Sequence, residues 1–147
     1  MMVIQSPSPF GRYAPPTGGP PVLVIDDDAI GAASTSAMLT DAGYPALSES
    51  DGDTVLRLVR TQVMRMVVSE IHVPCADGPC VVAALKQDRV RLPRLRVLVY
   101  TRHTSAADTE WALAAGCDAL VHRGSSPEVF LREVRRVDGD QIGARDP

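Results

Sequence analysis

Polar and charged residues stand at the ends of four apolar segments of this 147-residue chain. They are Asp26, Asp27 and Asp28 after VLVI, Glu70 after RMVVS, Thr101 and Arg102 after RVLVY, and His122 and Arg123 after ALV. Carboxylates gathered at such density repel one another unless a cation lies between them. Their oxygens are hard ligands that suit Mg²⁺ or Ca²⁺, and a hydroxyl facing a cationic group suits a phosphoryl oxygen. Brought together, these residues would form a metal and phosphate site.

The segments that carry these residues alternate between strand and helix patterns. Apolar runs of strand length predict strands at 22–26, 44–48, 65–70, 96–101 and 119–122. Helical spacing with capping and stop residues predicts helices at 28–42, 51–62, 79–89, 105–115 and 127–137. This (βα)5 order predicts an α/β fold, a flavodoxin-like doubly wound parallel sheet with strand order 2-1-3-4-5. The carboxyl ends of parallel strands share one edge, which would gather the polar residues.

Composition divides the chain into one domain and two tails. Dense proline and glycine at 1–21 predict a flexible tail, 22–138 the domain, and 139–147 a frayed end. From this length we expect no attached output domain. The proline-rich start is also compatible with a linker, in which case the chain is a piece of a longer protein.

Charge, hydropathy and cysteine content exclude several classes of protein. The formal net charge of −3 gives no electrostatic case for nucleic-acid binding. No apolar run approaches the roughly 18 residues that cross a membrane. Three cysteines, an odd number, argue against a disulfide framework and favour a reducing cytoplasm.

Four motifs follow one another along the chain in the order that is typical of one protein family. They are VLVIDDD, the V-P-x-x-D-G spacing that begins at 73, VLVYT, and AAGCDALVHR. With them, residues 22–137, nearly four-fifths of the chain, resemble the receiver domain of two-component response regulators. Each motif is weak by itself, and the four together are strong.

The resemblance implies a metal and phosphoacceptor set. Asp26 and Asp27 match the acidic pair that organises Mg²⁺, with Asp27 as the direct ligand. Glu70 matches the aspartate that takes phosphate from a histidine kinase and also ligates the metal. His72 matches the residue that lends its backbone carbonyl to the metal.

The resemblance also implies a phosphate pocket and a switch. Thr101 matches the hydroxyl residue that moves toward the phosphoryl group, and Arg123 matches the lysine that pairs with it. Arg102 completes the expected phosphate pocket. Leu120 matches the usual aromatic partner of Thr101 in the switch.

Three of these positions depart from the family pattern, namely Glu70, Arg123 and Leu120. Glutamate is one methylene longer than aspartate and carries its charge toward the place of a phosphoryl group. About 1 Å of misplacement in an in-line attack can cost on the order of 100-fold in rate. Because an arginine fork can hold a carboxylate bidentately, a standing Glu70–Arg123 pair would resemble an occupied site. We therefore expect a stand-alone, non-enzymatic signalling or interaction module that works without phosphorylation.

The expected partners are proteins, either a histidine kinase or a downstream signalling protein. In receivers the surface of the fourth helix, fifth strand and fifth helix, expected here at 105–115, 119–122 and 127–137, often forms dimers or contacts partners, so a homodimer through it is one expectation. Candidate contact residues are Trp111, Arg132 and Arg135. Plain packing of the tryptophan and a solvated helix face explain these residues as well.

Other interpretations of the same residues stay open. In a working receiver, Glu70 or another carboxylate would be phosphorylated. The D-x-D spacing at 26–28 also occurs in haloacid-dehalogenase-type phosphatases, but the later acidic motif and cap of that family are missing. Cys75 and Cys80 could join His72 in a zinc or redox site, although their spacing is unusual for zinc. The aspartates could serve only as helix caps, and Glu70 could be a relic.

Overall fold

The computed structural model describes residues 18–74, 81–88, 92 and 95–143. Strands and helices alternate along these residues, as the sequence predicts. In chain order they are β1 Val22–Ile25, α1 Ala29–Asp41, β2 Ala46–Glu49, α2 Gly52–Thr61, β3 Met66–Ser69, α3 Val81–Asp88, β4 Val97–Thr101, α4 Ala106–Ala114, β5 Ala119–His122 and α5 Pro127–Gly143.

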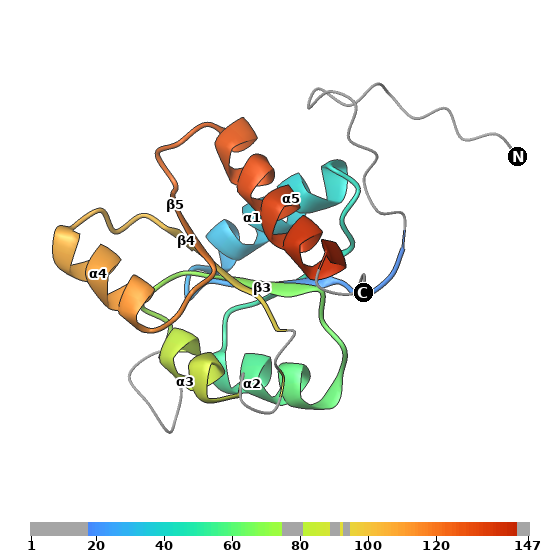
Figure 1. Ribbon diagram of the computed structural model, residues 1–147, viewed down its shortest axis with the longest axis horizontal. Helices are drawn as coiled ribbons and strands as arrows, with labels where there is room; N and C mark the ends of the chain where they lie inside the picture. The colour runs from blue at the N-terminus through green and yellow to red at the C-terminus, as the bar shows by residue number, and fades with distance from the viewer. Residues whose placement is uncertain (1–17, 75–80, 89–91, 93–94, 144–147) are drawn as a thin grey trace, which may run out of the picture.

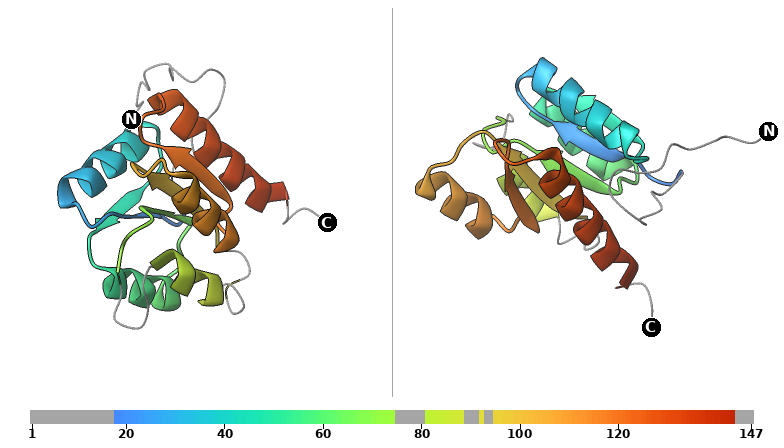
Figure 2. Two further views of the ribbon diagram at one scale, coloured as in Figure 1. Left: turned by 90° about the vertical axis from the view of Figure 1, so that its left-hand side faces the viewer. Right: turned by 90° about the horizontal axis from the view of Figure 1, so that it is seen from above.

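The strands form a parallel sheet in the order β2-β1-β3-β4-β5. The predicted order and the flavodoxin-like α/β class are confirmed. Helices α1 and α5 cover one face of the sheet and α2 and α3 the other, with α4 beside β5 (Figure 1, Figure 2). Because every strand runs the same way, all five carboxyl ends lie at one edge.

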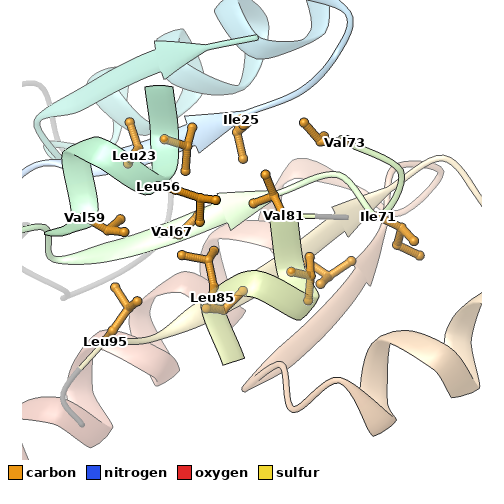
Figure 3. Close-up of a cluster of buried hydrophobic side chains, with 14 of the residues drawn as sticks. Leu23, Ile25, Leu56, Val59, Val67, Ile71, Val73, Val81, Leu85 and Leu95 are labelled. Carbon is orange, nitrogen blue, oxygen red and sulfur yellow. The ribbon is translucent and has the colours of Figure 1, made fainter. Parts of the chain in front are cut away.

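Alternate residues of the central strands supply two cores, one on each face of the sheet. On one face, Leu23 and Ile25 of β1 and Val67 of β3 pack against α2 and α3. Figure 3 shows this cluster, with Leu56 and Leu85 approaching the strands from the helices.

The opposite face carries the intervening strand residues. Val24, Val68 and Tyr100 pack there against α1 and α5, and the ring of Tyr100 stacks on that of Phe130 at 4.2 Å between centroids. Strands covered on both faces need continuous apolar sequence. This requirement explains why β1, β3 and β4 are recognisable in the sequence.

The second strand differs from its predicted bounds. The prediction placed it at 44–48, but β2 is Ala46–Glu49 and Tyr44 is buried beside α1 instead. Gly43 ends the turn after α1 with φ of 92°, and the Tyr44 amide donates to the Leu39 carbonyl at 2.9 Å. The Tyr44 amide therefore takes part in the hydrogen bonding that ends α1. The pairing of β2 with β1 begins only after this residue.

The last helix continues to Gly143, past the expected domain end at residue 138. Near the amino ends of the strands, the Arg65 guanidinium donates to both oxygens of Asp138, at 3.2 and 3.3 Å. The same group donates to the carbonyls of Pro20 and Gly18, at 3.1 and 2.9 Å. We call this set of contacts the Arg65 clasp. It ties the residues before β1 to β3 and α5, at the edge of the sheet opposite the polar residues.

Within the described part of the chain, no helix is long and apolar enough to cross a membrane.

Candidate functional site

Four strand ends bring the sequence-predicted polar residues together at one edge of the sheet. Asp26 follows β1, Glu70 follows β3, Thr101 ends β4, and Arg123 follows β5. Asp26, Glu70 and Thr101 are buried, at 0%, 1% and 0% exposure. A buried carboxylate must be paired or hydrogen bonded, so the partners of these groups decide what the site can do.

Asp26 is paired with two arginines. Its Oδ2 accepts a hydrogen bond from Nη2 of Arg123 at 2.7 Å, and its Oδ1 accepts one from Nη2 of Arg102 at 3.1 Å. The Asp28 amide also donates to Oδ1, at 2.9 Å. Burial raises the pKa of Asp26 above its ordinary value, while Arg123 and Arg102 lower it. Both oxygens of this carboxylate are therefore occupied by donors.

Glu70 is held by hydrogen bonds on both of its oxygens. Oε1 accepts from the Ile71 amide at 2.8 Å and from the Thr101 hydroxyl. Oε2 accepts from the Arg102 amide at 3.1 Å. Nε of Arg123 and Nε of Arg102 each lie 3.7 Å from Oε2. The expected Glu70–Arg123 pair exists as this longer contact and is not bidentate, because Asp26 takes the terminal nitrogen of Arg123.

Arg102 contacts the three aspartates that follow β1, a role that the sequence did not indicate. Besides Asp26, its Nη2 donates to Oδ1 of Asp27 at 3.2 Å, and its Nη1 lies 3.8 Å from Oδ2 of Asp28. The side chain thus reaches from the end of β4, past β3, to the aspartates after β1. The Arg102 guanidinium therefore places a positive charge among these three carboxylates.

Thr101 and Leu120, the two residues expected to form the switch, have different surroundings. The Thr101 hydroxyl donates to Glu70 and accepts from the His103 amide at 2.9 Å. Leu120 is partly buried against the core under α2 and α3. Tyr100 faces the other core, and its ring lies 4.6 Å below the Arg123 guanidinium carbon. This cation–π contact helps to fix the arginine.

The remaining predicted residues lie on the surface. The His72 side chain is 54% exposed, and its ring bonds Asp108 rather than the acidic pocket. The metal role of its backbone carbonyl stays a prediction. Trp111 on α4 is 37% exposed, and Arg132 on α5 is exposed while Arg135 is half-buried. Cys75 and Cys80 lie outside the described residues.

Gly31 of α1 lies against the pocket, and we expect Gly31→Ala to destabilise the fold. A Cβ there would lie 2.6 Å from Oδ2 of Asp26, which the Arg123 contact prevents from moving away. Overpacking of this kind costs about 1–3 kcal/mol. Urea unfolding should show a lower midpoint with an unchanged slope.

Gly139 provides the matched control for this substitution. It lies in α5, and a Cβ there would meet nothing within 4 Å. Gly139→Ala should be neutral or stabilise by up to about 1 kcal/mol through helix propensity. Equal effects of the two substitutions on the urea midpoint would show that the Asp26–Arg123 pair can shift to make room for an added methyl group.

The sequence matches the family profile of the response regulator receiver domain over residues 22–135. Among curated proteins, it is 29% identical over 118 residues to the transcriptional activator protein ExaE of Pseudomonas putida. That match spans 79% of this chain and 54% of ExaE. The chain spans about half the length of most of the curated relatives that it matches.

Solved receiver structures share the fold. A CheY-like receiver domain protein from Methanospirillum hungatei superposes with a TM-score of 0.74 at 19% identity, over 85% of this chain and 98% of the other. The beryllofluoride-activated NtrC4 receiver domain, solved as a dimer, gives a TM-score of 0.71 at 23% identity, over 82% and 97%. At these identities the likeness establishes the fold.

Proposed function

The chain belongs to the response regulator receiver family, and we propose that it acts there as a signalling or interaction module without phosphorylation. In this proposal Glu70 occupies the phosphoacceptor position. Ion pairs between residues of the pocket hold it in one arrangement, whereas the pocket of an ordinary receiver alternates between two. Thr101, the switch hydroxyl of the proposal, is already bonded to the residue that it would otherwise approach.

The bonding of Glu70 carries the proposal. A nucleophilic carboxylate needs a free oxygen directed at the phosphodonor, in a geometry that tolerates little displacement. Both oxygens of Glu70 accept hydrogen bonds from Ile71, Thr101 and Arg102, and the side chain is 1% exposed. Burial and these bonds hold both oxygens inside the site, so attack on a phosphodonor would require the side chain to move.

The second support concerns the metal that receivers use. Mg²⁺ requires oxygen ligands at about 2.0–2.1 Å in near-octahedral geometry. Both oxygens of Asp26 and Oδ1 of Asp27 already accept hydrogen bonds from Arg102 or Arg123. A guanidinium in that place neutralises the carboxylates as an ion would. As arranged, these residues do not fit a resident Mg²⁺ ion, and we propose that the module works without one.

The proposal is tested by the intact mass of the chain after exposure to acetyl phosphate with Mg²⁺. The natural protein is expected to gain no phosphoryl group, because Glu70 is buried and both of its oxygens are held by hydrogen bonds. It is also expected not to hydrolyse an aryl phosphate, since we propose a non-enzymatic module. A phosphoryl group found on Glu70 would overturn the proposal and identify a working receiver.

The partner is proposed to be a protein that contacts the surface of α4, β5 and α5. Trp111 and Leu113 of α4 are 37% and 56% exposed, which is high for large apolar side chains. Arg132 adds positive charge on α5. Aromatic and arginine side chains are enriched at interface hot spots. The NtrC4 receiver domain supports the possibility of a second copy as the partner, because it is a dimer in its activated form.

A further inference from the structure

Two of the three histidines of the chain lie together at the rim of the pocket. His72 stands two residues after Glu70, and His103 two residues after Thr101. Their rings meet edge to face, with centroids 4.5 Å apart. The two residues come from different loops, so the fold and not the sequence brings them together.

Asp108, in the first turn of α4, completes a cluster with the two histidines. Its Oδ1 lies 3.0 Å from Nε2 of His72, and one ligand atom from each of the three residues lies within 4.8 Å of the others. The Ser105 hydroxyl donates to the other carboxylate oxygen, Oδ2, at 2.8 Å. Ser105 therefore orients the carboxylate so that Oδ1 faces the imidazoles, as an outer partner orients a metal ligand.

The donor set suits a borderline divalent metal. Imidazole nitrogen favours ions such as Zn²⁺, whereas Mg²⁺ prefers oxygen ligands only. Ligands about 2.0–2.2 Å from zinc lie roughly 3.5 Å from one another, so these atoms need to close by about an ångström. His72 is exposed and the other two residues are half-buried, which leaves the side chains room to rotate. A fourth position would remain open to water.

We propose that His72, His103 and Asp108 form a binding site for a Zn²⁺-like divalent metal. The bound ion joins the loop after β3 to the loop after β4 and to the start of α4. The His103 amide bonds the Thr101 hydroxyl, which bonds Glu70. The ion therefore fixes the segment that positions Thr101. This site is separate from the carboxylate pocket, and its occupation does not depend on phosphorylation.

Calorimetric titration of the untagged full chain with Zn²⁺ tests the proposal. One ion per chain is expected to bind, and saturation should raise the thermal midpoint by several degrees because the ion binds the folded state. Mg²⁺ in large excess should not compete. His72→Ala and His103→Ala should each weaken Zn²⁺ binding at least tenfold, as should Asp108→Asn.

Two controls separate this site from other zinc donors of the chain. His122→Gln removes the third histidine, and Cys75→Ser with Cys80→Ser removes the thiols that follow His72 in the sequence. Both should keep the natural affinity. Because His72 is exposed, its alanine variant should fold normally, and far-ultraviolet circular dichroism checks this. Unchanged binding in the two histidine-to-alanine variants, or loss of binding with the cysteines, would overturn the assignment.

Discussion

Glu70→Asp combined with Arg102→Ala is expected to create Mg²⁺-dependent phosphorylation, about 100-fold or more above the background measured with the natural chain. The shorter side chain withdraws the carboxylate from the place of the phosphoryl group. Removal of the guanidinium takes away the hydrogen bonds that it now donates to Asp26 and Asp27, at 3.1 and 3.2 Å. Together the two changes would open a metal position beside a nucleophile of ordinary length.

Neither substitution alone should allow the chain to be phosphorylated. In Glu70→Asp the Arg102 guanidinium still lies among the aspartates, and in Arg102→Ala the longer Glu70 stays bonded to Thr101. Intact mass after acetyl phosphate treatment, with Mg²⁺ or with a chelator, measures the gain. Glu70→Asn with Arg102→Ala is the control that binds metal without a nucleophile. If the double variant binds no Mg²⁺ by calorimetry, then Arg102 is not what excludes the metal.

The second large effect is on stability: Arg123→Ala is expected to lower the free energy of unfolding by about 3 kcal/mol. Asp26 is fully buried, and removing one partner of a buried pair leaves an uncompensated charge. The loss lies at the lower end of the usual range because Arg102 still bonds Oδ1 of Asp26. The variant also loses the contact between Arg123 and the Tyr100 ring.

Denaturant unfolding measures this loss, with Arg132→Ala as the matched arginine control. Arg132 is exposed on α5, and its removal should change stability by no more than about 0.5 kcal/mol. Asp26→Asn added to Arg123→Ala should recover part of the loss, because the buried charge is then gone. Equal costs for Arg123→Ala and Arg132→Ala would contradict a structural role for the Asp26–Arg123 pair.

The loss in Arg123→Ala should also depend on pH. Burial raises the pKa of Asp26, and Arg123 opposes that rise. Without Arg123 the pKa of Asp26 in the folded state lies higher still, so the folded state retains a proton that the unfolded state releases. Stability of the variant then falls as pH rises through that pKa. The deficit relative to the natural protein should therefore widen as the pH rises above the ordinary pKa of an aspartate.

The sequence predicted the fold because its local signals agree with one another. Apolar runs mark the strands that are covered on both faces, and Asp28, Asp51 and Ser105 cap helices as their positions suggest. Glycines at 43 and 116 adopt the positive φ that ends α1 and α4. The exception is β2, an edge strand with little apolar sequence, whose start is set by the end of α1.

The gathering of Asp26, Glu70, Thr101 and Arg123 follows from parallel topology, so it could be predicted as well. The pairing of these residues could not. Arg102 reaches across β3 because its side chain is long, and only the packed structure decides which carboxylates it meets. The cluster of His72, His103 and Asp108 was missed because two segments far apart in the sequence supply it. The available signal was a histidine two residues beyond each of two neighbouring strand ends.

The Arg65 clasp is expected to slow the unfolding of the domain. It joins positions 45, 47 and 73 residues apart, at the edge of the sheet away from the pocket. Contacts of such long range carry a loop-closure cost, so we expect the clasp to form late in folding. Interactions absent from the folding transition state act on the unfolding rate and leave the folding rate nearly unchanged. We therefore expect Arg65→Ala to shorten the lifetime of the native state, although Arg65 lies at the opposite end of the molecule from the acidic pocket.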